Sequence, residues 1–537
     1  MGERILVCTA WPYANSSLHP GHMAGVYVPA DTFARFHRLR GNDVMMVSGS
    51  DMHGTPITVR AEQEGVSPNE VASRFHAEFL EYWQRLGISY DLYTKTSTEN
   101  HRQVTQDIFL KLHRQGDIFI QTMVSPFDPV ALRFLPDRYV EGTCPNCGFA
   151  RARGDQCDNC GRPLDPQQLI DARSTISGQA PEFRETEHFF LDLRRVNAGL
   201  LEWARQQTHW RSNVYNFTIR FLEDGLQARA ITRDIEWGIP IPIEGYESKR
   251  IYVWFEAVIG YLSASVECTT LRGDPDGWKR WWQEPSRSYY FIGKDNIVFH
   301  SVIWPGELMA YGDLNLPFDV PSNEFMNFEG EKFSKSRGVG VFMPELLARF
   351  DPDPIRYYLT ASAPEQSDSD FSLRELVRRN NDELVATWGN LVHRTLTFLQ
   401  RYYEGRAPRG AGDPLVKAEI DRVAARVTDG LEAARFKDTL AEALGLARFG
   451  NRYFDEHAPW RLVKQDRDAC ALVLGDLLEL INALKVLLAP FLPFSCARLH
   501  TLLGFQDTLE TRGWRLEPVP DGQALPIPTP LFTKLEE

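Results

Sequence analysis

Two histidines stand three residues apart in the segment SSLHPGHMAG, directly after the apolar run RILVCTAW. An apolar run followed by a Pro-Gly turn predicts a strand that leads into a helix, and the free N–H groups at a helix N-terminus attract phosphates. His19 and His22 fall in the first turn, where each imidazole can donate a hydrogen bond to phosphate. Pro20 fits this turn, and Gly21 allows close approach of a ligand. The pattern indicates a nucleotide site, with two surface loop histidines as the alternative.

A second positively charged segment, GEKFSKSRG, lies far downstream of the histidines. In it, Lys332 and Lys335 alternate with Ser334 and Ser336 between flanking glycines. Two lysines three residues apart, separated by small hydroxyl side chains, can form a clamp that closes on a triphosphate. A solvent-exposed Lys/Ser loop is the alternative, but its occurrence together with the histidine turn favours the clamp.

Four of the eight cysteines form two C-x-x-C pairs in the segment CPNCGFARARGDQCDNC. They are Cys144, Cys147, Cys157 and Cys160. Four thiolates predict one tetrahedral, structural Zn²⁺ site without an open ligand position; a reactive dithiol pair is the alternative. The next segment, STISGQAPEF, repeats the pattern of CDNCGRPLDP with Ser174 and Ser177 in place of cysteines. We expect a second knuckle there that has lost its metal ligands.

An α/β fold must position these segments. The sequence predicts strands at 4–11 and 43–51 and helices at 21–41 and 69–86, the alternation of a parallel sheet. Short strands and the cysteine cluster interrupt this alternation before it resumes with RIYVWFEAVIGYL and SYYFIGKDNIVFHSVIWPGELMA. Helices with apolar spacing follow. We therefore predict a Rossmann-type parallel-sheet domain with an inserted zinc-knuckle domain and a C-terminal antiparallel helical bundle. The expected parts are the first Rossmann half at 1–114, the insert at 115–229, the second half at 230–325, a linking segment at 326–372 and the helical domain at 373–537.

The net charge of −13 argues against nonspecific coating of nucleic acid but allows a local basic surface. One candidate surface is segment 371–410, which holds seven arginines and four acidic residues. No apolar run reaches the length of a membrane span, and the amino terminus enters a strand at once. We expect a cytoplasmic protein with no membrane partner.

Together, HPGH resembles the HIGH signature and KFSKS the KMSKS signature of class I aminoacyl-tRNA synthetases. Six more segments resemble the methionyl-tRNA synthetases and follow that family's order: AWPYAN, GSDMHGTPI, RDIEWGIPIP, YVWFEAVIGY, FIGKDNIVFHSVIWP and APW. The resemblance implies a ligase that activates L-methionine with ATP, with loss of pyrophosphate, and transfers methionine to the 3′-terminal adenosine of tRNA(Met), including the initiator. It also implies Mg²⁺ with ATP, one structural Zn²⁺ and, without an extra C-terminal module, a monomer.

The resemblance further implies roles for individual residues. His19 and His22 hold the ATP phosphates, and Lys332 and Lys335 close on the departing pyrophosphate. Other ATP contacts fall on Pro20, Gly21, Gly293, Asp295, Phe333, Ser334 and Ser336. The methionine pocket falls on Trp11, Tyr13, Asp51, Trp254, Ala257, Tyr261, His300 and Trp304. Aromatic walls suit a thioether, and Asp51 would pair with the ligand ammonium. Core packing is the commoner role of any single Trp or Tyr, but the spacing of the whole set is hard to explain by packing alone.

Two positions depart from the family pattern: Phe333 replaces the usual Met, and Val258 stands where many relatives have Pro. The family's anticodon readers fall on Asn390, Arg394 and Trp460, residue types that stack on and hydrogen-bond to exposed bases. A bundle-core role is the alternative for Trp460.

Three other functions fit parts of this sequence. Another class I synthetase, for valine, isoleucine, leucine or cysteine, is disfavoured because the branched-chain enzymes carry a much larger insert. A synthetase-like RNA-binding or zinc protein without catalysis would be free to lose the histidines and lysines. A small-molecule adenylyltransferase with an H-x-G-H turn leaves the zinc insert and the helical domain unexplained.

Overall fold

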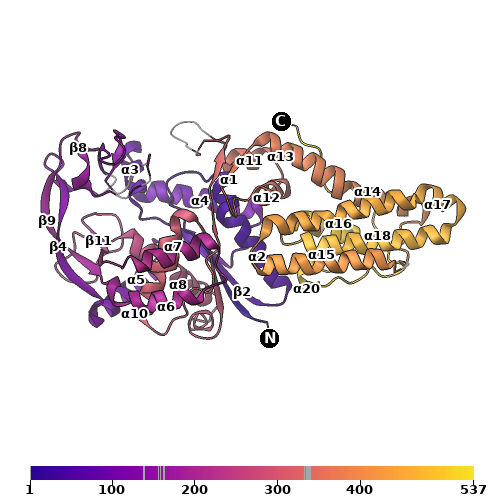
Figure 1. Cartoon of the computed structure of the whole chain (residues 1–537), viewed down its shortest axis with the longest axis horizontal. Coiled ribbons are helices and arrows are strands. Elements are labelled where there is room, and N and C mark those ends of the chain that lie inside the picture. The colour runs from indigo at the N-terminus through magenta and orange to yellow at the C-terminus, as the bar shows by residue number, and fades with distance from the viewer. Residues whose placement is uncertain are drawn as a thin grey trace.

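The computed structural model describes residues 2–136, 139–154, 157, 159–160, 162, 164–331, 333, 340–410 and 412–536. Figure 1 shows an elongated molecule with the sheets of the N-terminal part at one end and long helices at the other. The predicted α/β class with a helical C-terminal part is therefore confirmed. Across these residues, no helix combines the length and the apolarity needed to cross a membrane.

A five-stranded parallel sheet forms the centre of the N-terminal part. Its strands lie in the order β14 (Ser322–Asn323), β13 (Arg287–Gly293), β1 (Arg4–Thr9), β2 (Asp43–Ser50) and β3 (Leu92–Lys95). All neighbouring strands are parallel. The chain builds β1 to β3 outward in one direction and later adds β13 and β14 on the other side of β1. In such sheets, ligands bind beyond the carboxyl ends of the strands where the order reverses.

Helices cover both faces of this sheet. One face carries α2 (Val28–Leu39) and α4 (Pro68–Leu86), and the other carries α5 (Glu99–Gln115) and α8 (Val253–Leu271). Successive side chains of a strand point to opposite faces, so Val7 packs into the first core and Cys8 into the second. Both faces are buried, which explains why β1 reads as a continuous apolar run.

The chain leaves β1 through a loop and enters a continuous helical run, which was predicted at 21–41. The run consists of α1 (Pro20–His22), a π-helical segment Met23–Tyr27 and then α2. Pro20 occupies the first helical position, where its missing N–H breaks no intrahelical bond. π-helical turns are frequent at functional sites. This run places the two histidines beyond the carboxyl end of β1.

The segment RIYVWFEAVIGYL resumes the strand-helix alternation only in part. Its strand, β12 (Arg250–Ile251), is two residues long and pairs antiparallel with β11 (Thr232–Arg233), outside the central sheet. Its helix, α8, does pack on the sheet. The chain rejoins the central sheet at β13, in the segment SYYFIGKDNIVFHSVIWPGELMA.

The inserted segment forms two small antiparallel sheets. The larger contains β10 (Arg229–Ala230), β9 (Glu182–Leu191), β4 (Ile118–Asp128) and β5 (Arg133–Phe134), and the smaller contains β7 (Ala152–Arg153), β6 (Val140–Thr143) and β8 (Ile170–Ser174). The remaining helices of the N-terminal part are α3 (Thr55–Glu64), α6 (Asn197–Gln206), α7 (Ser212–Glu223), α9 (Lys279–Trp282) and α10 (Trp304–Tyr311). The smaller sheet carries the cysteine cluster between its strands.

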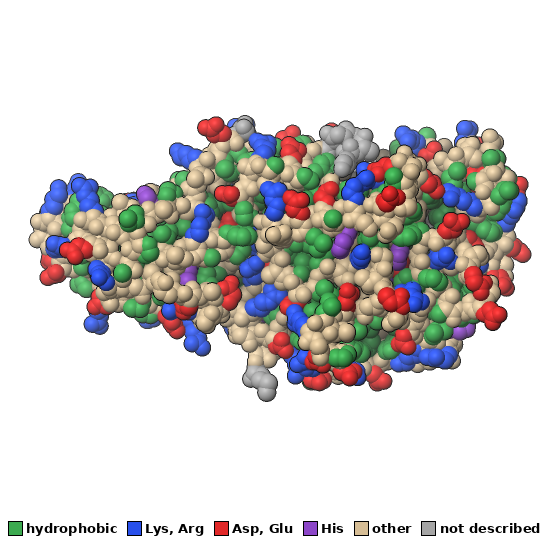
Figure 2. All heavy atoms as spheres, turned by 180° about the vertical axis from the view of Figure 1, so that it is seen from behind, with side chains coloured by type: hydrophobic (Ala, Val, Ile, Leu, Met, Phe, Trp, Pro, Cys, Tyr) green, Lys and Arg blue, Asp and Glu red, His purple; other side chains and the backbone are tan. Residues whose placement is uncertain are grey.

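A linking segment joins the two ends of the molecule. It holds β15 (Met326–Phe328), which pairs parallel with β16 (Ser369–Phe371), and the helices α11 (Met343–Arg349) and α12 (Pro352–Ala361). The helical part contains α13 (Leu373–Arg379), a π-helical segment Asn380–Gly389, α14 (Asn390–Tyr402), α15 (Pro414–Glu432), α16 (Phe436–His457), α17 (Pro459–Gln465), α18 (Arg467–Leu488), α19 (Pro493–Leu502) and α20 (Leu509–Arg512). Figure 2 shows positive and negative side chains interspersed over the reverse face of the molecule.

One fully buried arginine on α12 joins the two ends. Arg356 Nη1 lies 2.8 Å from Asp31 Oδ2 on α2, and both side chains are completely buried. The same guanidinium donates hydrogen bonds to the backbone oxygens of Phe491 at 2.8 Å and Pro490 at 3.1 Å. A planar guanidinium can make several such bonds at once. Arg356 therefore fixes the helical bundle against the helix that follows the two histidines.

Candidate active site

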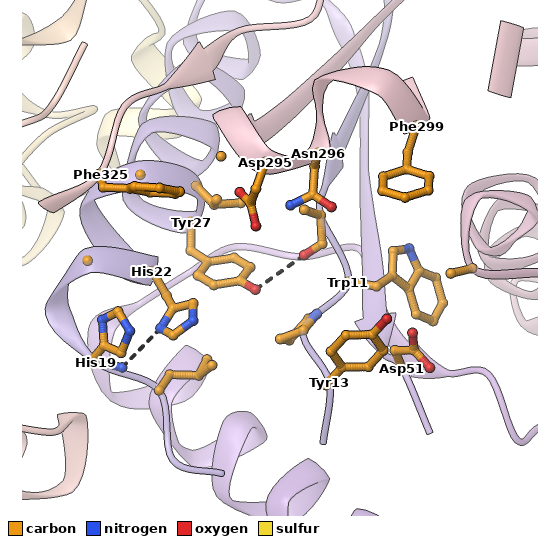
Figure 3. A pocket seen from close by; sticks show the side chains of 18 of the residues that line it. Trp11, Tyr13, His19, His22, Tyr27, Asp51, Asp295, Asn296, Phe299 and Phe325 are labelled. Atoms are coloured by element: carbon orange, nitrogen blue, oxygen red, sulfur yellow. Dashed lines mark hydrogen bonds between the residues drawn. The ribbon is translucent and has the colours of Figure 1, made fainter. Parts of the chain in front are cut away.

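A cavity of about 480 Å³ lies beyond the carboxyl ends of β1 and β13. Figure 3 shows His19 and His22 on one side of it and Trp11, Tyr13 and Asp51 on the other. It brings together thirteen of the residues singled out in the sequence: Trp11, Tyr13, His19, Gly21, His22, Asp51, Trp254, Ala257, Tyr261, Gly293, Asp295, His300 and Phe333. Segments up to about three hundred residues apart thus form one site, as the switch point of the sheet predicts.

Two of the expected ATP- and methionine-binding residues that the structure describes, Pro20 and Trp304, are not on this wall. Pro20 is buried. Trp304 is fully buried, and its indole N–H donates to the Tyr290 hydroxyl at 3.1 Å. Lys332, Ser334, Lys335 and Ser336 lie outside the described residues.

The two histidine side chains are in direct contact. The His19 backbone N–H donates to His22 Nδ1 at 3.2 Å, and the two ring centroids are 3.8 Å apart. Because Nδ1 of His22 accepts this bond, its Nε2 carries the proton of the neutral ring and can donate it to a ligand. Burial lowers the pKa of His22 to about 4, and burial followed by the proximity of His22 lowers the pKa of His19. Both rings are therefore neutral donors at physiological pH.

Close packing around the histidines explains Gly21. A Cβ atom there would lie 3.0 Å from the His19 ring and 3.0 Å from the backbone oxygen of Met326. Phe333 stacks on His19 with ring centroids 4.3 Å apart and an interplanar angle of 7°. The described residue of the KFSKS segment thus contacts the HPGH turn directly.

The aromatic wall depends on three glycines that the sequence analysis missed. The Trp11 indole lies between Gly49 of β2 and Gly260 of α8, where added Cβ atoms would approach its ring to 2.2 and 2.7 Å. A Cβ on Gly54 would lie 2.3 Å from the Tyr13 ring. A glycine inside a buried strand marks the close approach of another group, and Gly49 in DVMMVSGS is such a signal.

Asp51 ends the β2 segment beside these aromatics. Its backbone N–H donates to Pro12 O at 2.9 Å, and its backbone oxygen accepts from Ala14 N–H at 2.9 Å. These bonds fix the carboxylate beside Tyr13 (Figure 3). Burial, and then the nearby charge of Glu256, raise the pKa of Asp51 to about 7. A bound cation would favour its ionised form.

A polar pair faces the same cavity from α8 and the segment before α10. The Tyr261 hydroxyl lies 2.7 Å from His300 Nε2, and His300 Nδ1 lies 2.9 Å from the backbone oxygen of Asn296. Because a backbone oxygen only accepts, Nδ1 carries the proton and the Tyr261 hydroxyl donates to Nε2. Burial lowers the pKa of His300 to about 4, so this ring is also neutral. The pair offers a polar contact within an otherwise aromatic wall.

The cysteine cluster has the dimensions of a metal site. The Sγ atoms of Cys144 and Cys160 are 3.9 Å apart, and those of Cys147 and Cys157 are 3.6 Å apart. Tetrahedral thiolates bound to Zn²⁺ at about 2.3 Å lie about 3.8 Å from one another. Hydrogen bonds from the Phe149 backbone and the Asn159 side chain hold the pKa of the Cys147 thiol at about 6. The donors fit a zinc ion.

The predicted second knuckle has the same two backbone hydrogen bonds as the first. In the first, Cys144 N–H donates to Phe149 O at 2.8 Å and Gly148 N–H to Cys144 O at 3.0 Å. In the second, Ser174 N–H donates to Gln179 O at 2.8 Å, and Gly178 N–H donates to Ser174 O at 2.9 Å. The segment STISGQAPEF therefore repeats the backbone hydrogen bonds of a cysteine knuckle.

The expected anticodon residues cluster at the far end of the helical part. Arg394 of α14 donates to Asp455 Oδ1 at 2.9 Å, and its guanidinium lies 4.0 Å above the Phe454 ring. Trp460 of α17 stacks with Phe454 at 6.0 Å and is 43% exposed, which argues against the core alternative. Asn390 is exposed one helical turn before Arg394. The three residues form an accessible aromatic and cationic surface.

Comparison with known proteins agrees with this geometry. Residues 5–396 match the family described as tRNA synthetases class I (M), and residues 405–537 match the anticodon binding domain of methionyl tRNA ligase. The methionine–tRNA ligase of Thermomicrobium roseum is 54% identical over an alignment that covers 100% of this chain and 97% of that protein. That of Dehalococcoides mccartyi is 53% identical and covers 100% and 98%.

A solved structure matches over nearly the whole chain as well. Mycobacterium tuberculosis methionyl-tRNA synthetase in complex with methionyl-adenylate superposes with a TM-score of 0.80 at 27% identity, over 99% of both chains. The resemblance drawn from the motifs is confirmed, and the assignments to other amino acids or to a protein without catalysis lose their support. The chain belongs to the methionine–tRNA ligase family of class I aminoacyl-tRNA synthetases.

Proposed function

We propose that this chain joins L-methionine to ATP in the cavity described above and passes the methionyl group to the 3′-terminal adenosine of tRNA(Met), the initiator included. The observation that carries the proposal is that one cavity holds the neutral His19–His22 pair and, on its other side, Asp51 within an aromatic wall. Such a site can hold a polyphosphate and an apolar amino acid side by side. Membership of the family and the full-length similarity support the same reaction.

The first step requires positioning more than an activated nucleophile. The methionine carboxylate attacks the α-phosphate of ATP, the bond to the β-phosphate oxygen breaks, and pyrophosphate leaves with its electron pair. Catalysis then depends on in-line alignment and on donors for the developing phosphate charge. His22 Nε2–H and the His19 ring would donate to phosphate oxygens, and Mg²⁺ bound to ATP would offset charge. Lys332 and Lys335 would close on the pyrophosphate, with Ser334 and Ser336 beside them.

The methionine side of the cavity recognises two chemical features. Asp51 would pair with the ligand ammonium, since its carboxylate lies in the wall. Trp11, Tyr13 and Trp254 would surround the thioether, and the Tyr261–His300 pair would limit its depth. Ala257 leaves room for the side chain, while Trp304 supports the wall from behind through its bond to Tyr290. Gly293, Asp295, Gly21 and Phe333 would line the ATP side, and Pro20 would orient the turn.

The insert would bind one structural zinc ion through the four cysteines, which match the ligand distances. The ion would fix the small sheet and supply no open position for chemistry. Asn390, Arg394 and Trp460 would read the anticodon, because their exposed surface offers stacking and hydrogen bonding. We also propose the division into parts at residues 114, 229, 325 and 372, a monomer, and a cytoplasmic location.

Amino-acid-dependent exchange of labelled pyrophosphate into ATP tests the proposal. Methionine should be compared with cysteine, leucine, isoleucine and valine, followed by charging of tRNA(Met) transcripts with methionine. Exchange with methionine alone supports both the chemistry and the pocket. Exchange with another amino acid would overturn the pocket assignment, and absence of exchange by folded, zinc-loaded protein would overturn the catalytic assignment.

A further inference from the structure

A buried ion pair lies directly behind the carboxylate that faces the cavity. His53 follows Asp51 by two residues, and its backbone N–H donates to Asp51 Oδ1 at 3.0 Å. Its ring Nδ1 lies 3.0 Å from both carboxylate oxygens of Glu256 on α8. Glu256 is completely buried, and His53 is 8% exposed. The motifs assign no role to His53 or Glu256, so the pair needs a separate explanation.

Three parts of the chain supply the acidic and imidazole side chains around this pair. Asp51 and His53 come from the end of β2, Glu256 from α8, and His101 from α5. His101 Nε2 lies 3.5 Å from Glu256, and its Nδ1 lies 2.8 Å from the hydroxyl of Ser263, two turns further along α8. The indole of Trp237 contacts the edge of the His53 ring, with centroids 5.4 Å apart. Two carboxylates and two imidazoles thus share one buried volume.

Two ionised carboxylates in one buried site repel each other strongly unless a cation separates them. Burial alone would raise the pKa of Glu256, but His53 and His101 overcome this effect and hold it at about 2. Burial would lower the pKa of His53, yet Glu256 and Asp51 raise it. The charge of Glu256 raises the pKa of Asp51, whereas the charge of His53 lowers it. His53 is therefore the cation that allows both acids to ionise.

We propose that the His53–Glu256 pair is a positioning unit that directs the Asp51 carboxylate toward the amino group of the bound amino acid and offsets the negative charge behind it. The inference rests on the proposed function, because it assigns the amino group as the partner of Asp51. His53 and Glu256 are positioning residues, since neither is among the residues that line the cavity. The competing explanation is that the pair only holds the segment after β2 against α8 and has no effect on Asp51, a role called a structural pin below.

The two explanations differ for the variants His53→Gln and His53→Gln/Glu256→Gln. The single variant leaves two buried carboxylates without a cation, so Asp51 holds its proton and the KM for methionine rises. A one-unit rise in the pKa of a group near 7 reduces its ionised fraction at neutral pH roughly fivefold, and the KM follows. The rise should shrink as pH increases from about 6.5 to about 8.5. The double variant removes the repelling charge as well and should return the KM toward the wild-type value.

A structural pin predicts the opposite pattern. Both variants would then lose the His53–Glu256 contact, and the KM for methionine would be as high in the double variant as in the single one. The KM for ATP would change together with that for methionine. Either result overturns the inference. His188→Gln is the matched control, because His188 Nε2 forms a contact of the same length, 3.0 Å, with Asp234 outside the cavity, and the His188 side chain is 1% exposed. It should leave the methionine KM unchanged.

Calorimetry on the wild-type protein gives a second test that does not depend on variants folding. If ligand ammonium ionises Asp51, methionine binding near pH 7 releases up to about half a proton per site, measured in two buffers of different ionisation enthalpy. 4-(Methylthio)butanoate, which lacks the amino group, should release none. Equal release with both ligands overturns the inference while methionine-dependent exchange still stands. If the wild type shows no methionine-dependent exchange, the proposed function itself fails.

Discussion

The ring of Phe333 lies flat against the ring of His19, with centroids 4.3 Å apart and planes 7° from parallel. Phe333 also packs against Phe328 of β15, at 5.7 Å. The contact connects the KFSKS segment to the HPGH turn through an aromatic stack. The usual Met at this position could cover the imidazole but could not stack on it, so the departure from the family pattern has a structural consequence.

Removing this stack should weaken the positioning of His19. Phe333→Ala is expected to lower kcat of pyrophosphate exchange by about 2- to 12-fold, the equivalent of ~0.5–1.5 kcal/mol for an aromatic pair. Phe333→Met, which restores the family's residue, should stay within about twofold, since a thioether also packs well on rings. Steady-state exchange at saturating methionine and ATP measures both. An unchanged kcat in Phe333→Ala would show that the stack itself does not matter.

His22 should act as a neutral hydrogen-bond donor throughout the physiological range. Burial lowers its pKa to about 4, so the ring is uncharged above about pH 5 and its donor does not titrate between pH 6 and 8. kcat of exchange at saturating substrates should therefore be flat over that range. His22→Ala should lower kcat by about 100- to 1,000-fold, as for loss of one donor to a developing charge. An activity that falls through a pKa near 6.5 would contradict this assignment.

A carboxylate takes the place of metal in the second knuckle. Ser174 donates its hydroxyl hydrogen to Asp128 Oδ2 at 2.5 Å, and Asp128 Oδ1 accepts from the N–H groups of Val130 and Ala131 at 2.9 and 3.0 Å. A zinc-bound thiolate likewise accepts hydrogen bonds from backbone N–H groups. The wild-type protein should therefore contain one zinc ion per chain, and a strong chelator should remove it with loss of order confined to the insert.

Restoring thiolates at the second knuckle should create a second metal site. The quadruple variant Asp128→Cys, Ala131→Cys, Ser174→Cys and Ser177→Cys should raise the zinc content from one to two per chain, measured by elemental analysis after gel filtration. Four thiolates in this backbone provide a closed tetrahedral site. Ser174→Cys alone is the control and should keep one zinc. A quadruple variant that folds and still holds one zinc would show that the two knuckles do not converge.

The sequence predicted the elements better than the contacts between them. Strands, helices and the thiolate set follow from local periodicity and spacing, which survive in any tertiary setting. The position of Trp304 could not be predicted from its spacing to His300. Residues four apart share a face of an α-helix, but Phe299–Ile303 is π-helical, and its wider turn changes the phase between them. Trp304 thus faces Trp282 and Tyr290 rather than the cavity.

The glycines around Trp11 and the pair behind Asp51 were also missed, for a different reason. Gly260 lies more than two hundred residues from Trp11, as does Glu256 from His53. A single sequence does not show which distant residues contact each other. The histidine in GSDMHG was a usable signal, since an acid and an imidazole two residues apart often interact. Its partner on α8 could be found only in the folded chain.

Loss of the buried Arg356 should destabilise the junction between the two ends of the molecule. Arg356→Leu leaves Asp31 with Arg35 as its remaining cation, 2.8 Å away, and should cost about 3–5 kcal/mol of the free energy of unfolding. Burial alone would raise the pKa of Asp31, but Arg35 and Arg356 hold it at about 2. Because this pKa is lowered on folding, the stabilisation is present above about pH 4 and is lost as pH falls toward about 2. Urea unfolding at neutral and acid pH measures both effects, and the variant should show a weaker acid dependence.

The surface formed by Arg394, Phe454 and Trp460 should serve the tRNA and not the adenylation step. Trp460→Ala is expected to lower kcat/KM for charging of tRNA(Met) by about 5- to 150-fold, since stacking of one base contributes ~1–3 kcal/mol. Pyrophosphate exchange without tRNA should be unchanged, because the residue lies at the far end of the helical bundle (Figure 1). Leu472→Ala is the matched control, as Leu472 is 42% exposed on the neighbouring helix α18. Equal losses of charging and exchange in Trp460→Ala would indicate a damaged fold and exclude a separate RNA-reading surface.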